Sequence, residues 1–392
     1  MVPSYYEFHQ MTKICAGEKT LDNLAYELNI FHCARPLVLS DASIKSLGLM
    51  DTVCALLGQR EHESFTDIPP DSGLEVVKTA ARLYREKGCD GLVAVGGGSV
   101  LDTAKGVRML ISHDADDLLE LMGCDYLPSG RPVPLIAIPT TTGTGSEVTS
   151  VAVISHPSRQ VKLEFITACV QPNVAMLDPR MTATLPPRIT ASTGMDALCH
   201  AVEAYSCTQK NPLSDSYAIT AVDLVAANLG RVVEGDKDPM ARLALANAAM
   251  LAGAAFSNSM VGAVHAIGHA LGGVCHLAHG DAMSILLPHV MAYNMDVCGE
   301  YYAGLLLHLA GSEVYAATPA AQRGQRCAQA VRELAQRLNQ AAGLPLRLSE
   351  TGKVEREQFE QVARTALNDG AIIANPKAMD VSDVLAVLNA AW

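Results

Sequence analysis

The sequence predicts an α/β unit with a parallel sheet, followed by a unit built only of helices. In the first half of the chain, short apolar runs alternate with helical patterns, and each run stops at a glycine, a proline or an acid, as buried parallel strands do. After Leu185, Pro186 and Pro187 the pattern changes to long stretches rich in Ala and Leu, with few strand signals. We therefore expect the α/β unit at residues 1–184 and the helical unit at 185–392.

The individual elements follow from the same patterns. Residues 5–15 alternate loosely and are expected to form an edge strand, with a helix over 18–28. Buried strands are expected at 35–41, 92–95, 134–138 and 173–179, with a helix at about 72–87 and a hairpin after residue 149.

Composition excludes several classes of protein. The net charge is −12, from 29 basic and 41 acidic residues, so no basic surface for nucleic acid is expected. Apolar residues make up 49% of the 392 residues, but their runs are too short to cross a membrane, and no secretory signal is recognised. Eleven cysteines without paired spacing indicate a reducing compartment, so a cytoplasmic protein is expected.

Three consecutive glycines lie between a predicted strand and a predicted helix. Gly96, Gly97 and Gly98 would let the backbone approach a pyrophosphate, and the start of the helix at Ser99 would favour its negative charge. The spacing differs from the GxGxxG fingerprint. The next predicted strand is followed by a run of seven residues, 140–146, that are all Thr, Gly or Ser. Such a run suits the binding of a phosphate-bearing polyhydroxy ligand. A mobile linker is the less favoured alternative, because a β-like segment follows directly.

Asp41 follows an apolar run directly and precedes a predicted helix. In a dinucleotide-binding sheet, an acid at this position accepts hydrogen bonds from ribose hydroxyls and repels a 2′-phosphate, which favours NAD over NADP. The alternative is that Asp41 only caps the next helix. Lys162, on the return strand of the predicted hairpin, is within reach of a ribose or phosphate.

Four of the twelve histidines fall within the nineteen residues GAVHAIGHALGGVCHLAHG, residues 262–280. In a helix, His265 and His269 share one face, and upstream Asp196 and His200 share another. One carboxylate with three imidazoles suits Fe(II) or Zn(II) with one position left open. The ordinary alternative is that each pair is a packing or surface feature.

These motifs resemble the iron-containing (group III) alcohol dehydrogenase family over nearly the whole chain. The matching segments are GGGSVLDTAKG, PTTTGTGSEVT, MLDP, DALCHAVEAY and HAIGHALGG followed by HG. The resemblance implies the architecture shared with dehydroquinate synthase, a Rossmann-like nucleotide-binding domain followed by an all-helical domain. Two departures are an Asp after Gly280, where many relatives carry Asn shortly afterwards, and an additional His276.

The resemblance also implies roles for particular residues. His269 should lie near the substrate and the nicotinamide rather than on the metal, and is the expected proton carrier. The metal would be Fe2+, with Zn2+ or Mn2+ as alternatives. The expected metal ligands are Asp196, His200, His265 and His279; the expected cofactor-binding residues are Asp41, Gly97, Gly98, Ser99, Asp102, Thr140, Thr141, Thr144, Ser146, Val153 and Lys162; the expected substrate pocket is Val151, Phe256, Ala371 and Ile372.

The expected function is therefore a metal-dependent, NAD(P)-dependent alcohol dehydrogenase. Hydride would move between NAD and a small primary alcohol or aldehyde, with hydroxy acids disfavoured because the predicted pocket has no cation. A cytoplasmic homodimer or higher homo-oligomer is expected. The alternatives are a hydroxyacid-oxoacid transhydrogenase or nicotinoprotein, a non-redox lyase similar to dehydroquinate synthase, and a catalytically silent oligomer.

Overall fold

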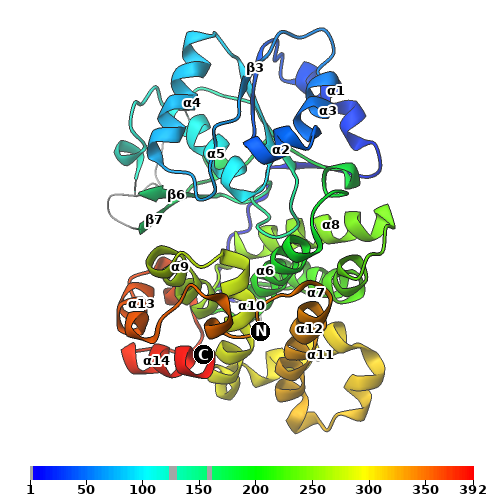
Figure 1. Cartoon of the computed structure of the whole chain (residues 1–392), viewed down its shortest axis with the longest axis vertical. Helices are drawn as coiled ribbons and strands as arrows, with labels where there is room; N and C mark the ends of the chain where they lie inside the picture. The colour runs from blue at the N-terminus through cyan, green and yellow to red at the C-terminus, as the bar shows by residue number, and fades with distance from the viewer. Residues whose placement is uncertain (1–2, 123–129, 157–160) are drawn as a thin grey trace. The chain divides into compact units, whose positions relative to one another are not determined.

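The computed structural model describes residues 3–122, 130–156 and 161–392 (Figure 1). The chain divides into two compact units. One covers His9–Leu185, and the other covers Pro186–Trp392 together with the residues before His9. The residues before His9 thus group with the helical unit, whereas the sequence placed them with the α/β unit.

A six-stranded sheet forms the centre of the unit His9–Leu185. All its strand pairs are parallel. All the strands are short. The four inner strands are fully buried, which explains why they read as continuous apolar runs in the sequence, whereas the two edge strands are only partly buried. In spatial order they are β1 (Lys13–Ala16), β8 (Val174–Leu177), β5 (Leu135–Pro139), β4 (Gly91–Gly96), β2 (Pro36–Leu39) and β3 (Glu63–Phe65).

Helices cover both faces of this sheet, as right-handed crossovers between parallel strands require (Figure 1). Along β4, Leu92 and Ala94 belong to one apolar core, and Val93 and Val95 belong to the other. The helices are α1 (Leu24–Ile30), α2 (Ala42–Ser46), α3 (Leu49–Ala55), α4 (Leu74–Glu86) and α5 (Gly98–Ser112). The antiparallel hairpin of β6 (Val151–His156) and β7 (Val161–Ile166) packs against α5.

The expected strand over residues 5–15 is only partly confirmed. The strand that forms, β1, begins only at Lys13 and ends at Ala16, and it is an edge strand of the sheet. Phe8 instead packs edge-on against Tyr217 of the helical unit, with ring centroids 5.4 Å apart. The expected helix over 18–28 is a short 3-10 turn, Thr20–Asn23, followed by α1.

The second unit is a bundle of helices around one large apolar core. The most extensive packing between helices is among α6, α7 and α8, and between α11 and α12. Its helices are α6 (Pro187–Ser206), α7 (Pro212–Val233), α8 (Pro239–Phe256), α9 (Ala263–Cys275), α10 (His279–Tyr293), α11 (Met295–Ala317), α12 (Arg323–Ala342), α13 (Phe359–Ala366) and α14 (Val381–Ala390).

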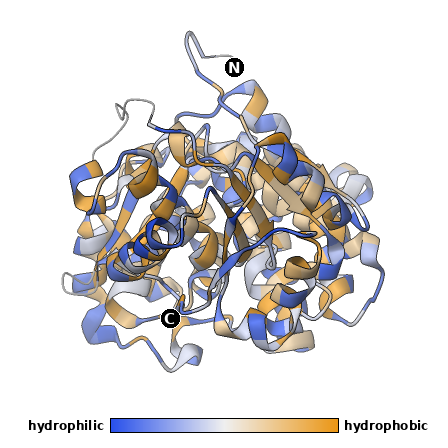
Figure 2. Cartoon of the chain, turned by 90° about the horizontal axis from the view of Figure 1, so that it is seen from above, coloured by the Kyte–Doolittle hydropathy of each residue, from blue (hydrophilic) through white to orange (hydrophobic). Residues whose placement is uncertain are grey.

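Helix α8 is long and apolar enough to cross a membrane by length and composition, but 61% of it is buried inside the protein. It packs along α6 and α7 as the core helix of a globular unit does. In Figure 2, the hydrophilic colour follows loops and outer helix faces, and the apolar colour lies on the segments between them.

Candidate metal and cofactor sites

Helix α6 presents three polar side chains on one buried face. Asp196, His200 and Glu203 are spaced four and three residues apart, so they lie one above another along the helix. Each is at most 5% exposed. Three buried polar groups on a helix in an apolar core need partners, and these come from α9 and from the start of α10.

Helix α9 and the turn after it supply the remaining histidines. His265 and His269 lie one turn apart on α9, and His279 is the first residue of α10. The turn between the helices depends on His276, which ends α9 with a positive φ of 55°. His276, the additional histidine of the sequence, is exposed and ends α9.

Asp196 Oδ1 is the point on which the histidines converge. It lies 3.4 Å from His279 Nε2, 3.7 Å from His200 Nδ1 and 3.8 Å from His265 Nε2. Three of these atoms, Asp196 Oδ1, His200 Nδ1 and His265 Nε2, are buried and make no hydrogen bond. Metal bonds of about 2.1 Å in a tetrahedral site hold neighbouring ligand atoms about 3.4 Å apart, so this spacing fits a divalent cation.

Ring packing holds the His200 imidazole in place. It stacks on Phe256 at a centroid distance of 4.4 Å and an interplanar angle of 16°, and it lies 4.3 Å from the ring of His265. Asp196, His265 and His279 each offer an atom within 4.8 Å of the others, and His200 completes the set through its 3.7 Å approach to Asp196. The chemistry of this donor set, three imidazoles and one carboxylate, fits Fe2+ or Zn2+.

The protonation states favour metal binding. Burial lowers the pKa of His200 to about 3 and holds the pKa of His265 well below its usual value. Burial alone would raise the pKa of Asp196, but His200, His279 and His265 outweigh it, and the pKa of the carboxyl falls. The cluster therefore offers neutral imidazoles and an ionised carboxylate, the forms in which these side chains bind metals.

His269 takes a different partner from the other histidines. Its Nδ1 lies 2.9 Å from Asp369 Oδ2, and its ring stacks against His279 at 5.4 Å. Contact with the His269 side chain lowers the pKa of Asp369, although burial alone would raise it. Asp369 also caps the 3-10 turn Gly370–Ala374, which carries Ala371 and Ile372. His269 thus contacts Asp369 through Nδ1, while the imidazole atoms that converge on Asp196 Oδ1 come from His200, His265 and His279.

Sequence reasoning missed Asp369 and Glu203. Glu203 lies three residues after His200 inside the motif DALCHAVEAY, so its helical spacing was available as a signal. Asp369 had no such signal, because its contact with His269 joins residues one hundred positions apart.

In the α/β unit, the glycine-rich turn lies against the Thr-rich loop. A Cβ atom on Gly98 would be 2.9 Å from Thr144 Cγ2, and one on Gly97 would be 3.2 Å from Thr141 Cγ2. Gly97 caps α5 without a side chain, so the first N–H groups of that helix have no side-chain cap. The two segments that the sequence assigned to a phosphate-bearing ligand are thus adjacent.

A buried lysine of α5 forms hydrogen bonds with the Thr-rich loop and with the residues that follow it. Lys105 is 0% exposed, and its Nζ contacts Ser146 Oγ at 2.8 Å, Thr149 Oγ1 at 2.8 Å and the Val151 carbonyl at 2.7 Å. Burial lowers the pKa of Lys105 to about 8, and burial likewise raises the pKa of Glu147 to about 7. Asp102 accepts hydrogen bonds from Ser146 Oγ at 2.6 Å and from the Val153 N–H at 3.1 Å.

Among the other predicted cofactor residues, Thr140 Oγ1 is buried without a hydrogen bond, whereas Asp41, Ser99 and Lys162 have partners within the α/β unit. Asp41 Oδ1 caps α2 through the N–H groups of Ser43 and Ile44. Lys162 Nζ lies 2.7 Å from Asp71, and Ser99 Oγ accepts the Asp71 N–H. The capping alternative for Asp41 is thus present in the structure. It uses one carboxylate oxygen and leaves the second without a contact to these N–H groups.

The four predicted substrate-pocket residues divide between the two units. Phe256, Ala371 and Ile372 belong to the helical unit, and Val151 belongs to the α/β unit. Within the helical unit, Phe256 touches the His200 ring, and Ala371 and Ile372 follow directly on the partner of His269.

Comparisons with known proteins match both units of the chain to the same family. Residues 11–179 match the model for iron-containing alcohol dehydrogenases, and residues 190–392 match the C-terminal model of the Fe-containing alcohol dehydrogenase family. The long-chain-alcohol dehydrogenase 1 of Geobacillus thermodenitrificans is 36% identical, covering 96% of this chain and 94% of that protein. The NAD-dependent methanol dehydrogenase of Bacillus methanolicus is 34% identical, and the match covers 95% of this chain and 96% of that protein.

A solved structure of a 1,3-propanediol oxidoreductase matches the fold with a TM-score of 0.93 at 30% identity, covering 99% of this chain and 100% of that one. The chain belongs to the iron-containing alcohol dehydrogenase family. It is an oxidoreductase and, within that class, an alcohol dehydrogenase.

Proposed function

We propose that this alcohol dehydrogenase binds a divalent metal, Fe2+ in the first instance, at Asp196, His200, His265 and His279, and interconverts a small primary alcohol and its aldehyde with NAD. The observation that carries the proposal is the set of buried atoms without hydrogen bonds that converge on Asp196 Oδ1. Leaving such atoms unpaired costs about 1–3 kcal/mol each, so a ligand that satisfies all of them at once is expected.

The bound groups would supply two kinds of chemistry, a Lewis acid for the substrate oxygen and a nicotinamide that accepts or returns hydride. The chain's own residues prepare that site. Asp196 contributes one negative charge among neutral imidazoles, so a divalent ion held there keeps a net positive charge. Phe256 covers one face of His200 and excludes water from it.

His269 is the proposed proton carrier. Its Nδ1 lies 2.9 Å from Asp369 Oδ2, and the family resemblance implies that its ring lies beside the substrate and the nicotinamide rather than on the metal. The imidazole would take up the hydroxyl proton of the alcohol during oxidation and return it during aldehyde reduction.

NAD is the proposed cofactor, with NADP disfavoured. The support is Asp41, whose carboxylate follows strand β2 and would repel a 2′-phosphate. Because Asp41 also caps α2, Asp41→Gly removes both the charge and the cap. Asp41→Asn retains a capping oxygen and removes only the charge, so it should narrow the preference for NAD without loss of stability. A wild-type preference for NADP would contradict this assignment.

A short, unbranched alcohol or diol is the proposed substrate, with aldehyde reduction faster at neutral pH. Phe256, Ala371 and Ile372 supply no charge. A carboxylate substrate would lose its hydration without gaining a cation, at a cost of several kcal/mol. The test compares ethanol, 1-propanol, 1,3-propanediol, glycerol and 4-hydroxybutyrate at fixed NAD. A highest kcat/KM for 4-hydroxybutyrate would contradict the proposal.

We further propose a cytoplasmic homo-oligomer that releases its cofactor at each turnover. The ten described cysteines are all free, as expected in a reducing compartment. Among the strands that the structure describes, β1 pairs only with β8, which leaves an edge for a second copy. Light scattering during gel filtration measures the oligomer, and cofactor retained after desalting would favour a nicotinoprotein or transhydrogenase instead.

The deciding experiment measures absorbance at 340 nm for metal-free protein with 1-propanol and NAD, before and after addition of Fe(II) under anaerobic conditions or of Zn(II). Metal-dependent formation of NADH supports the proposal. Activity that is unaffected by metal removal and addition would contradict it, and a complete lack of NAD reduction with all alcohols would favour the lyase or the silent oligomer.

A further inference from the structure

Glu203 is a buried carboxylate that contacts helix α9 at the turn where His265 lies. It is 5% exposed and comes from α6, one turn beyond His200. Its Oε1 accepts the Val264 N–H at 2.7 Å, and its Oε2 lies 2.5 Å from His265 Nδ1. The two oxygens therefore bind the backbone and the side chain of consecutive residues.

The first contact caps α9. The residue before this helix is Gly262, which has no side chain with which to accept the first N–H groups. Glu203 accepts from Val264, and Asn375 Oδ1 accepts from Ala263 at 3.2 Å. A carboxylate at a helix N-terminus is also favoured by the helix dipole. The start of α9 is thus fixed by side chains from other elements.

The second contact sets the proton position on His265. If Nδ1 carries the proton and donates it to Glu203, Nε2 is left with a lone pair, and Nε2 is the atom that lies 3.8 Å from Asp196 Oδ1. No other carboxylate contacts Nδ1 among the described residues; the nearest alternative partner is the thiol of Cys199 at 3.9 Å. Glu203 therefore makes the contact that determines which nitrogen faces the cluster.

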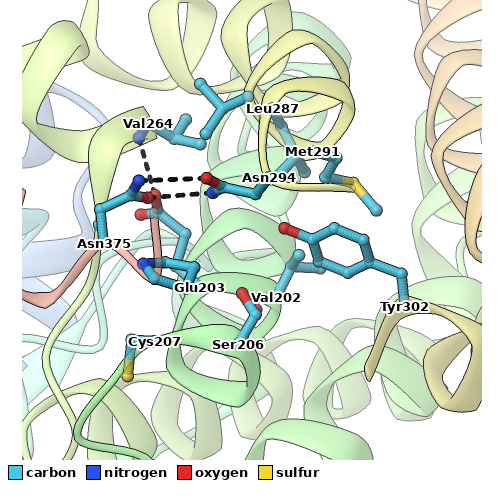
Figure 3. Close-up of a pocket in the computed structure, with 13 residues that line it drawn as sticks. Val202, Glu203, Ser206, Cys207, Val264, Leu287, Met291, Asn294, Tyr302 and Asn375 are labelled. Atoms are coloured by element: carbon cyan, nitrogen blue, oxygen red, sulfur yellow. Dashed lines mark hydrogen bonds between the residues drawn. The ribbon is translucent and has the colours of Figure 1, made fainter. Parts of the chain in front are cut away.

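The cavity beside Glu203 is small. This cavity, lined by Ser206, Asn294, Tyr302 and Asn375, leaves about 10 Å³ for the centre of a water molecule, enough for roughly one. Asn294 and Asn375 already bond each other in both directions, as Figure 3 shows. A Cβ atom on Gly262 would lie 3.0 Å from Asn375 Oδ1 and 3.1 Å from Glu203 Oε1, so a larger residue there must displace these side chains slightly.

We propose that Glu203 is a positioning residue of the metal site, which fixes His265 with its Nε2 lone pair toward Asp196 and thereby sets the affinity for the metal. The inference rests on the proposed metal site. Asp369 makes the corresponding contact to His269 one turn further along α9, at a histidine outside the ligand set. Two histidines on one helix are thus each held at Nδ1 by a carboxylate, and only the first pair is expected to control metal binding.

The test variant is Glu203→Gln. The amide oxygen can still accept the Val264 N–H, but the NH2 group now faces His265 Nδ1 and forces the proton onto Nε2. The dissociation constant for Zn2+, measured on metal-free protein by competition with a chromophoric chelator, should rise about 10- to 100-fold. In the metal-free protein, 15N chemical shifts of histidine should show the His265 proton moving from Nδ1 to Nε2, a change that a purely structural role would not produce.

Asp369→Asn is the matched control. It changes the same kind of pair on the same helix, so its Zn2+ dissociation constant should stay within about twofold of wild type while kcat falls. Gly262→Ala is a second variant in case Glu203→Gln does not fold; it keeps every polar group, displaces the Glu203 carboxylate by a few tenths of an ångström, and should weaken Zn2+ binding in the same direction by a smaller factor.

The outcomes separate the two proposals. If wild-type protein binds no Zn2+ or Fe2+, the proposed metal site is wrong. If wild type binds metal tightly and folded Glu203→Gln binds it equally well with an unchanged histidine spectrum, the positioning role of Glu203 is wrong. Equal weakening by Glu203→Gln and Asp369→Asn would also overturn it, because the effect would then not be specific to the ligand histidine.

Discussion

The protein contains two buried polar clusters, one in each unit, and they differ in whether the chain itself completes them. Around Lys105 in the α/β unit, the ammonium contacts two hydroxyls and a carbonyl, and Asp102 binds the same Ser146. Around Asp196 in the helical unit, three buried atoms face one another without a hydrogen bond.

The difference distinguishes a structural cluster from a binding site. A buried cation with its donors satisfied joins helix α5 to the Thr-rich loop and needs nothing further. A group of lone pairs that all point inward is unfavourable alone and becomes favourable when a cation enters. Both clusters are largely buried, so the converging atoms without hydrogen bonds around Asp196 carry the functional conclusion.

The largest expected effect is at Asp196. Asp196→Ala should abolish stoichiometric metal and lower kcat/KM by at least about a thousandfold, or roughly 4 kcal/mol, because it removes the only carboxylate of the ligand set. Metal content is measured by mass spectrometry. Chelation should also lower the Tm of wild type and leave that of Asp196→Ala unchanged. Full metal content in the folded variant would show that the two clusters do not differ in the way described.

The second effect is on stability, at Lys105. Lys105→Met should lower the free energy of unfolding by about 3–5 kcal/mol, because it leaves Asp102 and the groups that the ammonium bound without a charged partner. Denaturant unfolding measures this. Lys78→Met, at a lysine that is 27% exposed, is the control and should cost about 0–1 kcal/mol. A Lys105→Met variant as stable as this control would mean that the cluster is not structural.

The third effect concerns pH and Glu147, the carboxyl near Lys105. Its pKa is raised from 4.5 to about 7 by burial, so the folded protein holds this proton where the unfolded chain has lost it. The resulting stabilisation is complete below pH 4.5 and is lost as the pH rises through 7. Glu147→Gln should remove this pH-dependent loss of stability, which amounts to about 3 kcal/mol in wild type. Identical pH profiles for the two proteins would exclude a buried, titrating Glu147.

The smallest effect is at the hydroxyls that bind Lys105. Ser146→Ala should cost about 1–2 kcal/mol, because Ser146 bonds both Lys105 and Asp102. Thr149→Val removes one ligand of Lys105 without touching Asp102, so its cost should be lower. Neither change should alter metal content. Loss of metal in Ser146→Ala would show that the clusters are not independent.

The sequence by itself determined the class of fold, the type of each unit and the set of candidate ligands. Continuous apolar runs predict buried parallel strands, and helical spacing predicts that Asp196 and His200 share one face and His265 and His269 another, because both periodicities are properties of the local backbone. The Gly-rich turn and the Thr-rich loop were likewise recognisable from composition alone.

Only the tertiary structure decided how these groups are used. It paired His265 with Glu203 and His269 with Asp369, so two histidines with the same helical spacing have different carboxylate partners. It also showed that Asp102 and Lys105 form hydrogen bonds with the Thr-rich loop, and that Phe8 packs against Tyr217. Contacts between residues sixty to one hundred positions apart leave no local pattern, because they depend on where separate helices pack rather than on the spacing within either one.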